Sequence, residues 1–333
     1  KAVAFSADGL TMVGGTNHDN IDGMSFHGSA TVFTLSGGSW TEQATLTQSD
    51  GEGGDMFGVS VAVSGDGSTF VSGMTHDNVG GTSDQGSATV FTLSGSTWSE
   101  QATLTQSSGA ARDYFGWSAA MSEDGNTTVL GAVNGGDLDS GSVTVFTRSG
   151  STWSEQATLT ASDGAAGGMF GESVALSADG NTLIVGAMTD TVGGASQQGS
   201  ATVFTRSGNT WTQQQTIYTA DGAPYGMGGS GKGFGESVAL SADGSKSIVG
   251  APKHCAGDPG VCSGGSWQGS ATVFTSSGGT WTEQETIRQT GGEGSDEFGT
   301  SVALSDDGET AIIGIPGDDI PILPFGNGLG SIG

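Results

Sequence analysis

The residues best suited to chemistry are carboxylates in short polar loops that follow apolar segments. Four of them occupy comparable places in the chain: Asp19, Asp22, Asp77 and Asp190. Carboxylate oxygens are the ligands that Ca²⁺ prefers, so these aspartates are candidates for a cation or partner site on one rim. The same residue types form Asx turns in solvated loops. We favour the turn interpretation, because two of the loops carry His where a hard-cation site would have Asp.

No nucleophile, base and orienting group share the spacing of a catalytic motif. Residues 116–120, Gly-Trp-Ser-Ala-Ala, fail the last position of G-x-S-x-G. The glycine-rich residues 226–233 precede Phe-Gly and a predicted strand, whereas a phosphate-binding loop precedes a helix. The sequence therefore predicts a non-enzymatic protein that requires no cofactor. A secreted hydrolase or lyase acting on a polysaccharide is the alternative, and convergence of Asp, Glu or His from several repeats would favour it.

The two cysteines, Cys255 and Cys262, lie in one loop. A local disulfide is the favoured interpretation and would stabilise the fold by about 2–3 kcal/mol in the chain-entropy model. Such a bond indicates an oxidising, extracellular setting. A metal site that includes the adjacent His254 is less favoured, because the chain has no second cysteine pair.

Charge excludes several classes of partner. The 333 residues include 35 acidic and 8 basic ones, a formal net charge of -27. Such a surface repels nucleic acid and anionic membranes and suits cations, basic partners or solubility, including solubility in a high-salt habitat.

No apolar run approaches the ~20 residues that span a bilayer. The chain starts at Lys1 inside a repeat, so we expect a processed or trimmed chain.

The elements that must position these residues are repeats. Ser-x-Asp-Gly recurs six times, with spacings of 58, 58, 55, 64 and 64 residues, and recurrence of this kind indicates a repeat architecture. In the fourth unit, strands are expected over residues 170–178, 182–187, 199–206 and 211–219, with a loop over 188–198 and tight turns at Asp-Gly and Ser-Gly. Four antiparallel strands per ~58 residues are typical of one propeller blade.

The predicted fold is therefore all-β, a β-propeller of four-stranded antiparallel blades. Six units are visible, five complete and one partial, in a ring of six or seven. We expect one domain over residues 1–333, because a single blade is marginal and stability comes from burial between blades. The units cover about 1–50, 57–108, 115–163, 170–221, 234–290 and 298–317, followed by a tail over 318–333.

The sixth unit leaves an open edge, because only its first two strands are expected, within 300–315. An unpaired edge invites strand addition. We expect residues upstream of Lys1 or a neighbouring chain to close the ring, and the second option would make the protein a subunit of a filament or lattice. Four apolar residues of the tail are candidate partner contacts: Ile320, Ile322, Leu323 and Phe325.

Five tryptophans open the fourth strand of successive units, which favours packing between blades: Trp40, Trp98, Trp153, Trp211 and Trp281. Trp117 and Trp267 break this pattern and are candidate exposed aromatics for partner binding. Asn126 begins the one N-x-[ST] sequence and lies at a predicted hairpin tip, so it is a candidate glycosylation site.

Phe-Gly precedes the first strand of a unit and Gly-Ala or Gly-Ala-Pro follows the second, as in Phe234-Gly235 with Gly250-Ala251-Pro252. In this pattern the chain resembles the FG-GAP repeats of integrin alpha-subunit heads and of microbial secreted proteins. The resemblance implies a propeller, commonly seven-bladed, that is extracellular and serves adhesion. It also implies calcium in the first hairpin, but here Ala175 and Leu183 stand at the first and ninth ligand places. Calcium is thus not expected in the Asp-Gly hairpins, whereas the loops between strands two and three could bind it.

The predicted function is an extracellular, non-enzymatic adhesion or surface-structure module. Its expected partner is a protein or glycan at the cell surface or in the matrix. The alternatives are a subunit of an extracellular filament or lattice, joined through the incomplete last blade, and the polysaccharide-active hydrolase or lyase.

Overall fold

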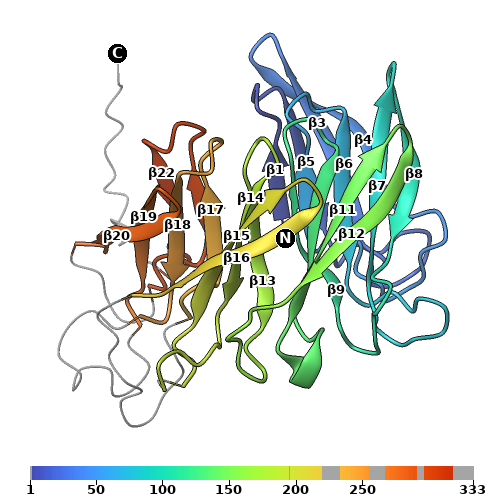
Figure 1. The fold of residues 1–333 in the computed structure, drawn as a ribbon. Helices are drawn as coiled ribbons and strands as arrows, with labels where there is room; N and C mark the ends of the chain where they lie inside the picture. Colours follow the sequence, from blue (N-terminus) through green and yellow to red (C-terminus); the bar gives the residue numbers. More distant parts are fainter. Residues whose placement is uncertain (1, 195, 220–232, 255–266, 291–295, 318–333) are drawn as a thin grey trace, which may run out of the picture.

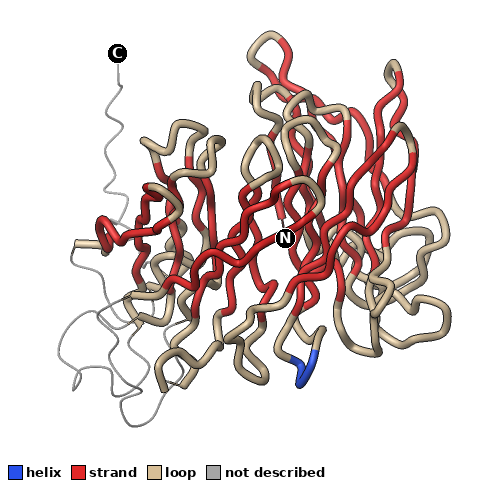
Figure 2. Tube along the Cα trace, in the orientation of Figure 1, coloured by secondary structure: helices blue, strands red, loops and turns tan. Residues whose placement is uncertain are grey.

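Each repeat forms one antiparallel sheet whose strands follow one another in sequence. The computed structural model describes residues 2–194, 196–219, 233–254, 267–290 and 296–317. Within these residues the protein is all-β apart from one short 3₁₀ turn, η1 (Asp137–Asp139) (Figure 2). The strand order within each complete sheet is sequential from the first strand to the fourth.

Five sheets have four strands and the sixth has two. The first contains β1 (Ala2–Phe5), β2 (Thr11–Thr16), β3 (Ser29–Ser36) and β4 (Ser39–Leu46). The second contains β5 (Val61–Val63), β6 (Thr69–Met74), β7 (Ser87–Ser94) and β8 (Thr97–Leu104). The third contains β9 (Phe115–Met121), β10 (Thr127–Ala132), β11 (Ser142–Ser149) and β12 (Thr152–Leu159).

The remaining sheets continue the pattern. The fourth contains β13 (Phe170–Leu176), β14 (Thr182–Ala187), β15 (Ser200–Ser207) and β16 (Thr210–Ile217). The fifth contains β17 (Ser237–Leu240), β18 (Lys246–Ala251), β19 (Ser270–Ser277) and β20 (Thr280–Ile287), and the sixth contains β21 (Val302–Leu304) and β22 (Ala311–Ile313). The predicted strands are confirmed to within a few residues, and the unit boundaries enclose these sheets.

The sheets are blades around one axis, so the predicted propeller is confirmed (Figure 1). The first strands of successive blades, β1, β5, β9, β13, β17 and β21, are neighbours in turn and are therefore innermost. Backbone hydrogen bonds join them in a belt: the amide of Ala7 donates to Gly65, Gly65 to Glu123, Glu123 to Ala178, Ala178 to Ala242, and Ala242 to Asp306. All six units thus contribute to the axis.

The hydrophobic core lies between blades. Val129 and Val145 of the third blade pack with Leu183 and Phe204 of the fourth. The alternation expected in the fourth unit is also confirmed, because Val174 and Leu176 pack toward the third blade and Ala175 packs toward the fifth. Both faces of an internal blade are covered, which explains why apolar residues occupy both sides of its strands.

The Phe-Gly and Gly-Ala dipeptides form the junction between blades. Phe115 is fully buried, and its backbone bridges to Gly86 of the preceding blade. A Cβ atom on Gly73 would lie 1.9 Å from the carbonyl oxygen of Gly116 in the next blade. The Ser60 hydroxyl donates to that same oxygen at 2.7 Å. The glycine is therefore required for close approach of two backbones.

The tryptophans of the fourth strands pack against the preceding blade, as predicted. The indole Nε1 of Trp153 donates to Gln101 Oε1 at 2.8 Å, and Trp98 and Trp211 make the equivalent bond at 2.9 Å. Trp40 differs because its blade has no preceding blade among the described residues. It is 41% exposed, compared with 8% for Trp98.

That face of the first blade is uncovered in the part of the chain that the structure describes. Val3 is 62% exposed and Phe5 53% exposed, and Phe5 packs edge-on against Trp40 with ring centroids 5.9 Å apart. The residue types are those of a covered blade face, so the surface is one that a further sheet would bury.

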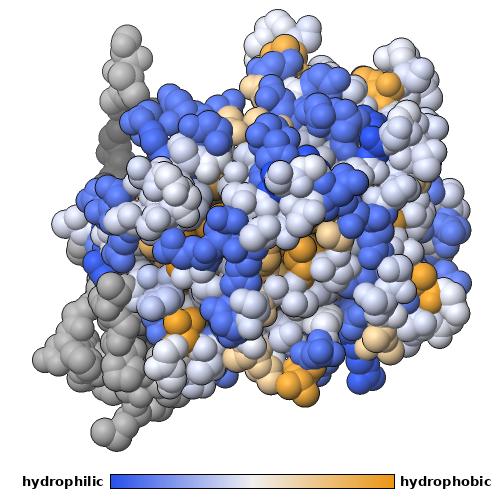
Figure 3. Space-filling model, viewed as in Figure 1, coloured by the Kyte–Doolittle hydropathy of each residue, from blue (hydrophilic) through white to orange (hydrophobic). Residues whose placement is uncertain are grey.

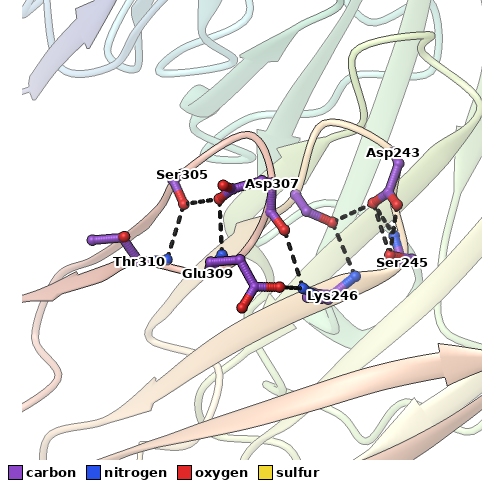
Figure 4. Close-up of polar contacts among 8 residues, drawn as sticks. Asp243, Ser245, Lys246, Ser305, Asp307, Glu309 and Thr310 are labelled. Atoms are coloured by element: carbon purple, nitrogen blue, oxygen red, sulfur yellow. Dashed lines mark hydrogen bonds and ion pairs between the residues drawn. The ribbon is translucent and has the colours of Figure 1, made fainter.

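In each Asp-Gly turn, the hydroxyl of the serine two residues before the aspartate donates to its carboxylate. Figure 4 shows the turns of the fifth and sixth blades, where Ser305 Oγ donates to Asp307 Oδ1 at 2.6 Å and the Glu309 amide donates to the same oxygen at 2.9 Å. Lys246 connects the two turns through an ion pair with Glu309 and a hydrogen bond of 3.1 Å to the Asp307 carbonyl (Figure 4). The carboxylates of Asp243 and Asp307 thus stabilise their turns by accepting hydrogen bonds from serine hydroxyls and backbone amides.

Candidate functional site

One rim of the propeller gathers most of the residues that could recognise a ligand. The innermost strand of each blade starts there, and in the second to sixth blades Phe-Gly lies at or just before that start. The loop between the second and third strands emerges at the same rim. We call it the Phe-Gly rim. The η1 turn belongs to it and lies at the lower side of Figure 2. The Asp-Gly turns lie at the opposite end of the axis, because they follow the innermost strands.

A cluster from three blades lies at this end of the innermost strands. It consists of Trp117, Glu172, Glu236 and Lys253. The position directly after Phe-Gly supplies the first three of them, in the third, fourth and fifth blades. The indole of Trp117 hydrogen-bonds to Glu172. Lys253 Nζ lies 3.7 Å from Glu236 Oε2.

Burial raises the pKa of both carboxyl groups. For Glu172, loss of solvation is the largest cause, the Trp117 hydrogen bond opposes it, and the charge of Glu236 adds to it, so its pKa rises to about 7. For Glu236, burial again raises the pKa, Lys253 lowers it, and Glu297 raises it. Glu172 is therefore about half protonated near neutral pH.

The arrangement allows two kinds of chemistry. A carboxyl group with a pKa near 7 exchanges protons readily at neutral pH, which is a property of general acids and bases. A tryptophan beside charged and hydrogen-bonding groups is also a common recognition surface for proteins and sugars. Perturbed carboxyl groups are enriched at functional sites, which makes this cluster the leading candidate on the rim.

The predicted cation ligands do not form one group. Asp190 is buried, and its carboxylate accepts hydrogen bonds from the amides of Ala165 and Thr191 at 3.0 and 2.8 Å and from Ser200 Oγ at 2.7 Å. Asp19 accepts a hydrogen bond from Ser29 Oγ at 2.5 Å. These contacts are the local turn chemistry that the sequence favoured.

The same contact recurs in other loops. At the equivalent place in the second blade, burial raises the pKa of Asp77 above its ordinary value, and the nearby Ser87 opposes that rise. In the fifth blade His254 takes the place of the aspartate, with its Nδ1 2.7 Å from Ser270 Oγ. Asp22 has a left-handed φ of 51° in its turn. Among the described residues no three His, Cys, Asp or Glu side chains lie together as a metal site.

The predicted partner-binding tryptophans are less exposed than expected. Trp117 is half-buried and belongs to the Glu172 cluster, and Trp267 is half-buried beside the fifth blade. The four apolar residues of the tail, Ile320, Ile322, Leu323 and Phe325, lie outside the described residues, as do Cys255 and Cys262.

Asn126 is exposed at its hairpin tip, as predicted. Its side-chain amide is nevertheless engaged: Nδ2 donates to Asp124 Oδ2 at 3.0 Å, and Oδ1 accepts a hydrogen bond from Arg148 Nε at 3.1 Å. Attachment of a glycan to Nδ2 would have to displace the contact with Asp124.

Sequence reasoning missed Glu172, Glu236 and Lys253. The signal was present, because the residue after Phe-Gly varies as Val59, Trp117, Glu172, Glu236 and Thr300. Only the ring brings these positions side by side. The two glutamates are 64 residues apart in the chain but interact electrostatically in the fold.

No helix in the described part of the chain is long and apolar enough to cross a membrane. A search of curated proteins found no match. Among solved structures, the chain is similar to hydrazine synthase of Kuenenia stuttgartiensis, with a TM-score of 0.57 and 16% identity over 94% of this chain and 73% of that one. That likeness concerns the fold alone.

The family comparison is more specific. The FG-GAP repeat model matches residues 40–91, 98–146, 153–204 and 281–331, more than half of the chain. The first three matches run from the tryptophan of one blade's fourth strand to the phenylalanine of the next blade's third strand, so each spans a junction between blades. The chain belongs to the FG-GAP repeat family.

Proposed function

We propose that this protein is an extracellular, non-enzymatic interaction module that binds a protein or glycan partner through its Phe-Gly rim. One observation carries the proposal: the Trp117, Glu172, Glu236 and Lys253 cluster brings an aromatic ring and charges of both signs together from three blades. The loops between strands two and three surround it on the same rim. The face of the protein seen in Figure 3 is mostly hydrophilic or of intermediate hydropathy, with small separate apolar patches.

Hydrogen bonds that hold the rim loops in place support a role in partner binding. The Asp19 and Asp190 carboxylates hold two rim loops through bonds to Ser29 and Ser200. Binding by preformed loops loses less conformational entropy than binding by mobile ones. Calcium at Asp19 or Asp190 would act only as an accessory, since these two carboxylates already accept hydrogen bonds from the protein.

The test is a screen of the protein against a glycan array and a panel of cell-surface and matrix proteins. A Trp117→Ala variant is expected to lose at least tenfold in affinity for any partner found. Trp40→Ala is the matched control, because Trp40 is exposed near the opposite end of its blade. Equal loss in both variants, or no loss in Trp117→Ala, would contradict binding at this rim.

A second candidate is a hydrolase or lyase acting on a polysaccharide. The specific observation that favours it is the convergence of Glu172 and Glu236 from two blades, with the pKa of Glu172 raised to about 7. A protonated Glu172 would donate its proton to the departing sugar oxygen. Incubation with acidic, neutral and basic polysaccharides would reveal new reducing ends or unsaturated products, and Glu172→Gln should abolish them. Activity that Glu172→Gln leaves intact would exclude this site.

A third candidate is a filament or lattice subunit, favoured by the uncovered apolar face of the first blade. Sedimentation at several concentrations tests it. Association that Trp40→Asp weakens would support it, and a monomer at every concentration would rule it out.

A further inference from the structure

A cavity of about 160 Å³ lies on the propeller axis, at the end opposite the Phe-Gly rim. Its lining comes from all six blades. The apolar part consists of Phe5, Val63, Met121, Leu176 and Leu240, one side chain from each of the first five innermost strands or their ends. Its size is close to that of a cavity that holds benzene, about 150 Å³. A ligand of about six heavy atoms therefore fits.

Two carboxylates stand at the cavity. The position between Ser and Asp in the Ser-x-Asp-Gly turns holds small residues in four blades but Glu123 in the third and Asp306 in the sixth. Both line the cavity, and because they are three blades apart they approach it from different sides of the axis. The Glu123 side chain extends over Gly65, where a Cβ atom would lie 2.3 Å from its Cγ. Both carboxylates are solvent-exposed and none of the lining residues is basic.

The backbone around the cavity also disfavours anions. At five of the six positions between Ser and Asp, the amide N–H is already used in the belt of hydrogen bonds, which range from 2.8 to 3.0 Å. An anion would find no free donors at these five positions. The carbonyl oxygens of the belt each accept one hydrogen bond and have a second lone pair, so they and the carboxylates can still accept from a donor. The formal net charge of -27 adds a field of the same sign.

We propose that this axial cavity binds a small organic cation, a primary ammonium on a short aliphatic chain. The ammonium group lies between the carboxylates of Glu123 and Asp306, and the chain packs against Phe5, Met121 and Leu240. The site is independent of the rim and of the function proposed for it. A lysine side chain of a partner and a free alkylamine share this chemistry.

The probes are pentylamine, 1-pentanol and pentanoate, which have similar size but differ in charge. Binding is followed by the methyl NMR signal of Met121, which lines the cavity. Pentylamine is expected to shift this signal with saturation, 1-pentanol to bind at least fivefold more weakly, and pentanoate not to bind. A short lysine-containing peptide tested beside free pentylamine distinguishes the two sources of the ammonium group.

Charge dependence is tested with the double variant Glu123→Gln and Asp306→Asn, which keeps the shape of the site. Affinity for pentylamine should fall about tenfold, since each exposed ion pair contributes up to about fivefold. The control is Glu42→Gln with Glu285→Gln, which removes the same charge at exposed residues of the outermost strands and should leave affinity within twofold. Equal binding of 1-pentanol and pentylamine, an unchanged affinity in the double variant, or no shift of Met121 would overturn the proposal.

Discussion

Replacement of Glu172 by Gln should stabilise the protein in a pH-dependent way. Burial raises the pKa of Glu172 from its ordinary 4.5 to about 7. Below pH 4.5 the group is protonated in both the folded and the unfolded chain and contributes nothing. As the pH rises, the unfolded chain releases the proton while the folded chain keeps it, so the wild type loses stability until the pH passes about 7.

The size of the stability change follows from the pKa shift of Glu172. Each pKa unit corresponds to about 1.4 kcal/mol, so the full effect is on the order of 3 kcal/mol, of which about 2.5 kcal/mol falls between pH 5 and pH 8. Glutamine has no proton to release. The free energy of unfolding of Glu172→Gln minus that of the wild type should therefore increase by that amount over this range.

Urea unfolding at pH 5, 6, 7 and 8 measures this difference. Lower pH is avoided because the pI of about 4.1 brings the net charge near zero and favours aggregation. Glu285→Gln is the control, since Glu285 is exposed on β20, and its difference from the wild type should be nearly independent of pH. A pH-independent difference for Glu172→Gln would refute the inference that burial neutralises this carboxylate.

Three further predictions concern the fold. Gly73→Ala should destabilise the protein by at least about 3 kcal/mol, because its Cβ would lie 1.9 Å from a carbonyl oxygen of the next blade; Gly14→Ala, with no atom within 4 Å, is the control, and equal urea midpoints would contradict the packing at the junction. Trp153→Phe should cost about 1 kcal/mol through loss of its 2.8 Å hydrogen bond to the preceding blade, and thermal unfolding indistinguishable from the wild type would show that the bond contributes nothing. Ser241→Ala should raise the pKa of Asp243, because the hydrogen bond from the Ser241 hydroxyl, followed by that from the Ser245 amide, lowers this pKa. Carboxyl NMR titration measures the pKa, and an unchanged value would show that Ser241 does not stabilise the Asp243 carboxylate.

Most of the fold could be predicted because its determinants repeat. Alternating apolar residues, Asp-Gly turns and a period near 58 residues specify a blade locally. The regular tryptophans were also assigned correctly to packing between blades, since equivalent positions in a ring meet equivalent neighbours. The exposure of Trp40 shows the limit of that reasoning: its sequence context matches that of Trp98, but no described blade covers it.

The candidate sites could be predicted only in part. The sequence favoured turn chemistry for the aspartates of the rim loops; in the fold, Asp19 and Asp190 accept hydrogen bonds from Ser29 and Ser200, ten residues further along the chain. Glu172 and Glu236 could not be predicted as site residues, because a single glutamate after Phe-Gly has no distinctive neighbours in sequence. Trp117 was singled out as an exposed aromatic, but in the fold it is half-buried and hydrogen-bonded to Glu172.

The sequence by itself determined which residues form strands, where the chain turns, and that one apolar sheet must pack against the next. These properties depend on side-chain alternation and on glycine or aspartate at single positions, so short segments of the sequence specify them. Only the tertiary structure decided which variable positions meet at the axis, because the packing of successive blades around it places residues some 60 positions apart beside one another. Burial at that meeting point raises the pKa of Glu172, whereas Glu123 and Asp306 stay exposed at the other end of the same axis.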